Sequence, residues 1–285
     1  MQLAHDPRFL RRLVRHRNGQ VGASAEGMRW LCGIIVFSLL VAALAWAVGG
    51  YHTGFHTLNA LAPWAGEVFW QNLTHLGNGS VALALLLLFA RNHPSAVWTG
   101  LIAAVFALLL SHGIKYGATT LRPPAVLDAD AFHLIGRGWP TRSFPSGHTV
   151  TAFVFAAIFI AHMHSTLARA LLLLAAILVG GSRVVVGVHW PIDVLAGAAL
   201  GTAAAVIGIS LGRRWRWGLQ PVGHRICVLV LVVGTFGLFD EINGYPHAML
   251  LSQTLAVLAL AVASIDYLGP LLRAAAVRRL TSGSP

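Results

Sequence analysis

Long apolar runs constrain this chain more than any other feature, because a polypeptide crosses lipid only as helices or as a closed barrel. A hydrocarbon core roughly 30 Å thick takes about 20 residues of α-helix. Windows of this kind lie at residues 28–48, 95–114, 149–165, 166–181, 192–211 and 247–268. Two more, 78–90 and 226–239, are apolar but short, and a shallow re-entrant segment is the alternative to a full span. The pattern predicts an all-α, polytopic transmembrane helical bundle.

The composition and the net charge support this interpretation. Of the 285 residues, 10% are charged and 56% are hydrophobic, against roughly 25% and 45–50% in soluble domains. The net charge of +11 raises the alternative of nucleic-acid binding, and RRWRWG at 213–218 interleaves arginine with tryptophan. Beside an apolar run, such a segment is instead typical of an anchor at the lipid interface. We therefore expect no nucleic-acid partner.

The positive charges lie unevenly along the chain. If the N-terminus is cytoplasmic and eight segments cross, 15 of the 20 Lys and Arg residues fall on the cytoplasmic side, as the positive-inside rule requires. These are Arg8, Arg11, Arg12, Arg15, Arg17, Arg29, Arg91, Arg169, Arg213, Arg214, Arg216, Arg225, Arg273, Arg278 and Arg279. The apolar segments that follow the basic N-terminus favour an uncleaved anchor over a signal peptide. Abundant alanine, with 19 arginines against one lysine, fits a high-GC bacterial coding bias. We therefore expect a bacterial inner membrane protein.

The remaining five cations would face the periplasm and need another explanation. They are Lys115, Arg122, Arg137, Arg142 and Arg183. Residues 115–148 form the longest polar connection, and its four prolines exclude a continuous helix. The stretch SRVVVGVHWPID, residues 182–193, returns to the same face. An outward loop at 50–77 is expected to contain an amphipathic helix at the interface. Polar clusters distant in sequence therefore meet at one membrane surface.

Three of these cations predict an anion site. Lys115 supplies an ammonium group, and Arg122 and Arg183 supply guanidinium forks that match phosphoryl oxygens in bidentate fashion. Taken one at a time, each has a structural explanation, because Lys115 and Arg122 could snorkel at a helix end. Arg183 could likewise pair with Asp193 as intramembrane structure. Taken together, the three favour a phosphate site.

The segment that ends the long connection adds backbone donors to this site. Ser146 is placed to cap a helix that begins near His148, and Gly147 lets the backbone N–H groups there approach an anion closely. No Walker-type phosphate loop is present. Asp128 and Asp130 form a D-x-D pair, but without further ligands a solvated loop is favoured over a metal site. We expect neither a metal nor a cofactor.

Two histidines beside the anion site indicate a nucleophile and a general acid. His189 has a carboxylate four residues later, at Asp193, and Pro191 between them suits the first turn of a helix. Asp193 is therefore expected to hold one ring nitrogen of His189 and to leave the other free. This arrangement favours His189 as the nucleophile and His148 as the acid.

These segments resemble, in order and with full spacing, the three signature motifs of the type 2 phosphatidic acid phosphatase superfamily, the integral membrane lipid phosphate phosphatases. They are Lys115-x6-Arg122-Pro123, Pro145-Ser146-Gly147-His148 and Ser182-Arg183-x5-His189-x3-Asp193. The resemblance covers about residues 75–211. It implies a six-helix core with a metal-independent site at its outer face.

The resemblance also implies a role for each motif residue. The phosphoryl group is bound by Lys115, Arg122, Ser146, Gly147 and Arg183. His189 attacks phosphorus to give a phosphohistidine and Asp193 orients it. His148 protonates the leaving oxygen and later activates water. Outside the motifs, Arg142 is the expected headgroup contact, in preference to Arg137, because it lies four residues from Ser146.

The expected organisation has three parts. A basic cytoplasmic segment occupies residues 1–27, a transmembrane phosphatase core residues 28–212, and a C-terminal extension with two apolar segments residues 213–285. The resemblance does not explain the two ends. Within the core, Gly197 and Gly201 form a small-xxx-small pattern that is typical of close helix packing.

The leading hypothesis is a phosphatase that acts at the outer face on undecaprenyl diphosphate, phosphatidylglycerol phosphate or phosphatidic acid. Two alternatives stay open at this point. One is a phosphotransferase that passes the phosphoryl group to another lipid such as lipid A. The other is a lipid-phosphate carrier or binding protein without catalysis. The sequence sets neither the lipid nor the oligomeric state.

Overall fold

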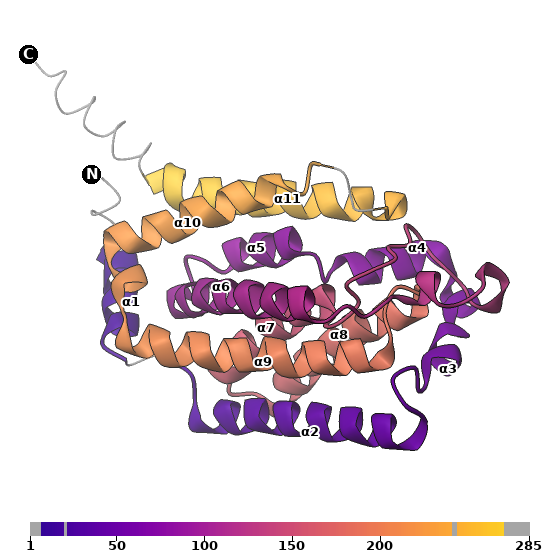
Figure 1. Ribbon diagram of the computed structural model, residues 1–285. Helices are drawn as coiled ribbons and strands as arrows, with labels where there is room; N and C mark the ends of the chain where they lie inside the picture. The colour runs from indigo at the N-terminus through magenta and orange to yellow at the C-terminus, as the bar shows by residue number, and fades with distance from the viewer. Residues whose placement is uncertain (1–6, 20–21, 241–243, 271–285) are drawn as a thin grey trace, which may run out of the picture.

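The computed structural model describes residues 7–19, 22–240 and 244–270, and these ranges contain helices and connections but no strand (Figure 1). The longer helices are α1 (Pro7–Arg17), α2 (Ala25–Gly49), α3 (Phe55–Asn59), α4 (Ala62–His75), α5 (Gly79–Leu88), α6 (Pro94–Gly117), α7 (Gly147–His162), α8 (Thr166–Val185), α9 (Pro191–Arg214), α10 (Pro221–Phe236) and α11 (Met249–Ala263). The 3₁₀ helices are η2 (Pro123–Ala125), η3 (Ala129–Ala131), η4 (Trp217–Leu219) and η5 (Pro246–Ala248), and η6 (Ser264–Leu268) is a π-helix that continues α11. The expectations for Arg273, Arg278 and Arg279 lie outside the described residues.

Five segments of the described chain are long and apolar enough to cross a membrane, which makes this an integral membrane protein. They are α2, α6, α8, α9 and the segment Pro246–Leu268 that contains α11. The short helices α5 and α10 correspond to the two short windows. The span expected at 149–165 is also short, because α7 has 16 residues and ends at His162. Beyond it, the side chain of Ser165 caps α8 by accepting a hydrogen bond from the N–H of Ala168.

The helix α8 is longer than the apolar window that predicts it. It continues to Val185 rather than ending at residue 181. Ser182 and Arg183 therefore lie in its last turn, and only residues 186–190 connect it to α9. Because a helical turn has fixed geometry, the direction of the Arg183 side chain is set by a rigid element.

Glycines along α9 allow it to pack closely against α7 and α6. A Cβ atom added at Gly201 would lie 2.4 Å from the carbonyl oxygen of Val150 in α7, and one added at Gly197 would lie 2.9 Å from that of Ser146. Such separations are shorter than van der Waals contact. The predicted close-packing face at Gly197 and Gly201 is therefore confirmed.

The helices α10 and α11 of the C-terminal extension lie beside α5 (Figure 1). α5 has only 10 residues, and it contacts these two helices as well as α6 and α7. The packing is close, since a Cβ atom at Gly234 would lie 2.3 Å from Cδ1 of Leu83. The extension is thus packed onto the core along the side formed by α5.

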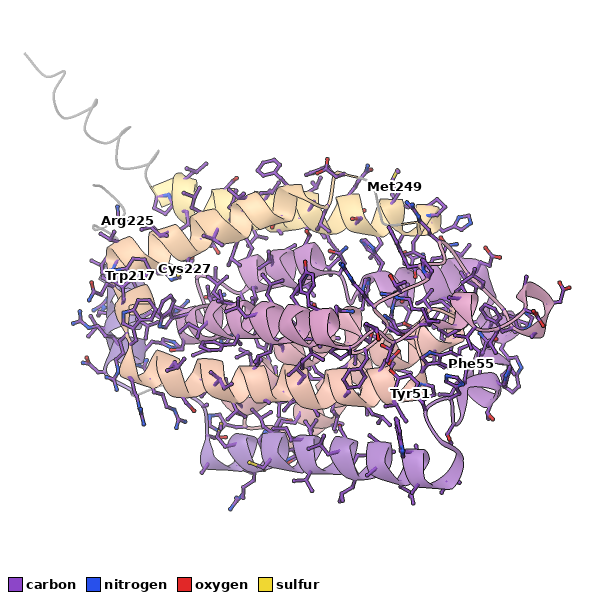
Figure 2. All side chains as sticks on the ribbon, viewed as in Figure 1. Tyr51, Phe55, Trp217, Arg225, Cys227 and Met249 are labelled. Atoms are coloured by element: carbon purple, nitrogen blue, oxygen red, sulfur yellow. The ribbon has the colours of Figure 1, made fainter. Side chains whose placement is uncertain are left out.

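The two ends of the bundle differ in character. One end carries α3, α4 and the loop between α6 and α7, and Tyr51 and Phe55 lie there (Figure 2). The opposite end carries α1 and η4, with Trp217 and Arg225 (Figure 2). At this second end, the guanidinium group of Arg213 donates a hydrogen bond of 2.6 Å to the carbonyl oxygen of Ala23. The polar loops and the arginine-rich segments are therefore separated by the length of the helices.

We expect Gly201→Ala to lower the unfolding temperature of the detergent-solubilised protein. The added methyl group overpacks the contact with Val150, which costs about 1 to 3 kcal/mol of stability. Gly33→Ala in α2 is the matched control, because a Cβ atom there has no neighbour within 4 Å. Since alanine favours helix over glycine, the control should be neutral or slightly stabilising. Equal losses in the two variants would contradict this account.

Candidate active site

Two connections meet at the loop-rich end of the bundle and form one polar site. The indole Nε1 of Trp190, in the α8–α9 connection, donates a hydrogen bond of 2.8 Å to the carbonyl oxygen of Leu121 in the α6–α7 loop. The backbone N–H of Ser146 donates one of 3.1 Å to the carbonyl oxygen of Asp193. The two polar clusters that the sequence places on one face are therefore in direct contact.

The carboxylate of Asp193 holds His189 in one orientation. Nδ1 of His189 lies 3.2 Å from Oδ2 of Asp193, and the two side chains are 2% and 0% exposed. A carboxylate only accepts hydrogen bonds, so Nδ1 is the ring nitrogen that carries the proton. The lone pair is then on Nε2. The predicted contact between Asp193 and one ring nitrogen of His189 is confirmed.

Asp193 is itself fixed by several donors. It lies at the third position of α9, where Oδ2 accepts a hydrogen bond of 2.9 Å from the backbone N–H of Trp190. The hydroxyl of Ser143 donates to Oδ2, and that of Tyr51 donates to Oδ1. Both oxygens are thus occupied, and the carboxylate cannot turn without losing these bonds. The imidazole that it holds is therefore preorganised.

His189 is uncharged at neutral pH. Burial lowers its pKa to about 3, and the charges of Arg122 and Arg183 act in the same direction, while the hydrogen bond to Asp193 opposes them. A buried imidazole surrounded by cations resists a further positive charge. Nε2 of His189 therefore keeps its lone pair available throughout the physiological range.

Arg183 is held by neutral hydroxyl groups. Its Nη1 donates hydrogen bonds of 2.6 Å to Oγ1 of Thr74 in α4 and 2.9 Å to the hydroxyl oxygen of Tyr245. Its Nε is buried and has no hydrogen-bond partner in the described part of the protein. A buried N–H without a partner is costly. The guanidinium group therefore has an edge that suits an anionic ligand.

The other two predicted cations are oriented by backbone carbonyl groups of the α6–α7 loop. Nε of Arg122 donates to the carbonyl oxygen of Thr141 at 3.0 Å, and Nζ of Lys115 donates to that of Arg142 at 3.0 Å. Burial, together with the nearby charge of Arg183, lowers the pKa of Arg122 to about 10. Arg122 still carries its charge at neutral pH. Cations that lie close enough to lower one another's pKa indicate a site for an anion.

The N-terminus of α7 faces this cluster with free backbone donors. Ser146 occupies the N-cap position, as predicted, but its hydroxyl accepts a hydrogen bond of 2.9 Å from Oγ1 of Thr149 and makes no cap bond to the backbone. A Cβ atom at Gly147 would meet no atom within 4 Å. The first N–H groups of α7 thus have no cap bond from Ser146, and a helix N-terminus of this kind is suited to an anion.

His148 lies beside a cavity that is mostly apolar. The cavity has a volume of about 680 Å³ and lies between α5, α6 and α7, with Gly147 and His148 among its lining residues and Phe155 and Ile158 deeper along α7. A Cβ atom at Gly77 would lie 2.8 Å from Cβ of His148, so the α4–α5 junction packs directly on this histidine. His148 therefore connects the polar site to an apolar space.

The remaining predictions have mixed outcomes. The guanidinium carbon of Arg142 lies 5.0 Å from the ring centre of Tyr116, and that of Arg137 lies 4.3 Å from the ring centre of Trp139. Both side chains are exposed, and the headgroup contact of Arg142 stays a prediction.

The pair Asp128 and Asp130 is exposed, and the described residues contain no group of three or more His, Cys, Asp or Glu suited to a metal ion.

Four further residues of the site were not predicted from the sequence. Ser143 and Tyr51 bind Asp193, while Thr74 and Tyr245 bind Arg183. Ser143 carried a weak signal, because it stands three residues before the predicted cap at Ser146. The others carried none, since their partners are 62 to 142 positions away in the sequence.

Comparison with known proteins agrees with this geometry. Residues 96–217 match the PAP2 superfamily. Phosphatidylglycerophosphatase B of Bacillus subtilis is 33% identical over 153 residues, which are 49% of this chain and 71% of that protein. This chain belongs to the PAP2 superfamily. The resemblance seen in the three motifs is thereby confirmed.

Two further similarities concern the same part of the chain. An undecaprenyl-diphosphatase of Sulfolobus acidocaldarius is 33% identical over 128 residues, which are 45% of this chain and 60% of that protein, so less than two thirds of this relative is covered. The crystal structure of Aquifex aeolicus LpxE is similar with a TM-score of 0.51 and 30% identity, over 55% of this chain and 92% of that one. The superfamily match ends at residue 217, before α10 and α11.

We expect His189→Gln to weaken the dependence of thermal stability on pH. Below the unfolded-state pKa of about 6.5, the unfolded chain binds a proton at this position that the folded protein does not bind until about pH 3. Stability therefore falls as the pH falls through this window, by up to about 1.4 kcal/mol per pH unit. Glutamine removes that contribution.

The measurement compares unfolding temperatures at pH 7.5, 6.5, 5.5 and 4.5 in one detergent. The control is His56→Gln, which changes an exposed histidine of α3. Wild type and the control should lose stability in parallel, and His189→Gln should lose less. Three parallel curves would contradict the assignment of a neutral, buried His189.

Proposed function

We propose that this protein is a metal-independent phosphatase that removes a terminal phosphoryl group from a membrane lipid at the outer face through a phosphohistidine at His189. One observation carries the proposal. A neutral imidazole, fixed by Asp193 at Nδ1, lies in a buried cluster with Arg122 and Arg183. A nucleophile with a free Nε2 lone pair beside guanidinium groups is suited to attack on phosphorus.

The reaction takes place in two displacements. In the first, His148 holds a proton on both ring nitrogens once the negatively charged phosphate is bound beside it. Nε2 of His189 forms a bond to phosphorus while the bond from phosphorus to the lipid oxygen breaks, and His148 donates one of its protons to that oxygen. In the second, His148 takes a proton from water, and the resulting hydroxide oxygen bonds to phosphorus. The phosphorus–nitrogen bond then breaks, its electron pair returns to Nε2, and inorganic phosphate leaves.

Charge in the transition state is stabilised by side chains and by the backbone. Lys115, Arg122 and Arg183 would surround the equatorial oxygens, and the free N–H groups at the start of α7 would contact one of them. The Nε of Arg183, which has no hydrogen-bond partner in the described residues, would gain one when an anion binds. By analogy with the loss of one oxyanion donor, we expect each cation to lower the barrier by on the order of 3 kcal/mol.

The donor set favours chemistry without a metal. Asp193 is the carboxylate of this site, and its two oxygens already accept hydrogen bonds from Ser143, Tyr51 and the Trp190 backbone. A hard divalent cation needs several free oxygen ligands. Here the positive charge comes from the protein itself.

The apolar cavity beside His148 supports a lipid as the substrate. If His148 protonates the leaving oxygen, the rest of the leaving group extends from its side of the site. The cavity of about 680 Å³ begins there and continues along α7 to Ile158. We propose that it accepts the first part of the lipid chain while the phosphate binds the cations. The names of the relatives, phosphatidylglycerophosphatase B and undecaprenyl-diphosphatase, support both a monophosphate and a diphosphate as headgroup.

The deciding experiment measures phosphate release by the purified protein in excess EDTA. The substrates are undecaprenyl diphosphate, phosphatidylglycerol phosphate, phosphatidic acid and lipid A, and each is also tested with an acceptor lipid present. Release that is lost in His189→Ala supports the phosphatase. Transfer of labelled phosphate to the acceptor, without release, would replace it with the phosphotransferase, and binding without turnover would replace it with the carrier.

We expect His148→Ala to accumulate the covalent intermediate when the leaving group needs no acid. With a nitrophenyl phosphate ester, the first displacement proceeds without protonation, but the second still lacks its base. Labelled phosphate should therefore stay on the protein in an acid-labile form in His148→Ala and be absent in His189→Ala. Label in both variants, or in neither, would count against these roles.

We also expect the site to face the periplasm, because the arginine-rich end of the bundle favours the cytoplasm. In a background with Cys32 and Cys227 replaced by serine, Asp130→Cys places a thiol in the exposed α6–α7 loop and His164→Cys places one in the α7–α8 turn. In spheroplasts, a membrane-impermeant maleimide should label the first variant only. The reverse pattern would refute an outer-face site.

A further inference from the structure

A loop of the C-terminal extension reaches into the phosphate site. Tyr245 stands between α10 and α11, directly before η5, and its side chain is only 3% exposed. Its hydroxyl oxygen accepts a hydrogen bond of 2.9 Å from Nη1 of Arg183, and its ring centre lies 5.6 Å from the guanidinium carbon. The superfamily match ends at residue 217. An extension outside the matched residues therefore contacts the cation cluster.

The loop is fixed in this position by close contacts with the α6–α7 loop. Gly136 and Gly244 both have a left-handed backbone, with φ of 81° and 86°. A Cβ atom at Gly136 would lie 2.6 Å from Cε1 of Tyr245, and one at Gly244 would lie 2.5 Å from Cβ of Arg137. Only glycine tolerates both the conformation and the approach. The two loops are thus packed backbone to backbone around the tyrosine ring.

Hydrogen bonds to α4 hold the extension from the other side. The backbone N–H of His247 donates to Oε1 of Gln71 at 3.0 Å, and Nδ2 of Asn72 donates to the carbonyl oxygen of His247 at 3.2 Å. A few residues further, the hydroxyl of Ser252 and Nε2 of His75 are 3.2 Å apart. Since α4 also carries Thr74, both partners of the Arg183 Nη1 atom are placed by one connected assembly.

We propose that Tyr245 is a positioning residue for Arg183, which makes the C-terminal extension a part of the phosphate site. This inference rests on the proposed function. Two neutral hydroxyl groups orient one end of the guanidinium group and leave its positive charge intact. A carboxylate in their place would neutralise that charge. The Nε atom, which is buried without a hydrogen-bond partner in the described residues, remains available to an anion. Without the phenol oxygen, the Arg183 side chain keeps one of the two hydrogen-bond partners that it has among the described residues, Thr74, and its orientation is less fixed.

The test uses Tyr245→Phe, which removes the hydroxyl and keeps the packing of the ring. The matched control is Tyr267→Phe in η6, because Tyr267 is also a buried tyrosine of the extension and its hydroxyl bonds to Nε2 of His224 at 2.8 Å. A hydrogen bond to a charged group is worth enough to change a rate on the order of 10-fold to 100-fold. We expect kcat/KM to fall by about that factor in Tyr245→Phe and to be unchanged in Tyr267→Phe, with similar small decreases in unfolding temperature.

A double-mutant cycle separates positioning of Arg183 from a general structural effect. Arg183→Lys keeps a positive charge but has no Nη1 atom for Tyr245 to hold. If Tyr245 acts through Arg183, adding Tyr245→Phe to Arg183→Lys should cause less than a 2-fold further loss. The same 10-fold loss in both backgrounds would overturn the proposal, and so would an equal loss in Tyr267→Phe.

Binding of orthovanadate and of inorganic phosphate makes the test independent of turnover. Both oxyanions are titrated into wild type, Tyr245→Phe and Tyr267→Phe, and the rise in unfolding temperature is recorded. Weaker binding in Tyr245→Phe alone supports the proposal even if no lipid is hydrolysed, in which case only the proposed function fails. Equal binding in all three proteins would overturn the role of Tyr245, and no binding to wild type would overturn both.

Discussion

The hydrogen bonds of the Asp193 carboxylate determine how the rest of the site is built. One buried side chain at the start of α9 accepts donors from the α2–α3 connection through Tyr51, from the α6–α7 loop through Ser143, and from the α8–α9 connection through the Trp190 backbone and His189. A buried negative charge is costly unless donors surround it. That requirement draws three separate connections to the end of one helix. The orientation of the imidazole is a consequence of satisfying this charge.

The cations of the site, unlike the Asp193 carboxylate, are held only partly and by uncharged groups. Arg122 and Lys115 contact backbone carbonyl groups, and Arg183 contacts hydroxyl groups. None of these partners carries a charge, so the positive potential of the cluster is not cancelled before a ligand arrives. Mutual repulsion between the cations is a cost that the packing of α6, α8 and their loops must offset. The proposed phosphoryl ligand, with its spread of negative charge, would relieve that repulsion on binding.

The sequence predicted those parts that depend on local pattern. Apolar windows located the helices, Gly197 and Gly201 marked close packing, and the four-residue spacing from His189 to Asp193 predicted a contact that the structure contains. Hydropathy alone did not predict the helix ends. The structure ends α7 at His162 and continues α8 through Arg183, and neither boundary coincides with the edge of an apolar window. Tyr51 and Tyr245 could not be predicted. Their partners are fixed by tertiary packing, and an isolated tyrosine near a membrane surface is commonly an interface anchor.

The short helix α5 has a consequence for how the protein fits its bilayer. Ten residues of α-helix rise about 15 Å, which is half the thickness of the hydrocarbon core. The helices α10 and α11 lie against α5 and take the place of lipid there. Where α5 is too short to span the hydrocarbon core by itself, protein from the C-terminal extension lies beside it.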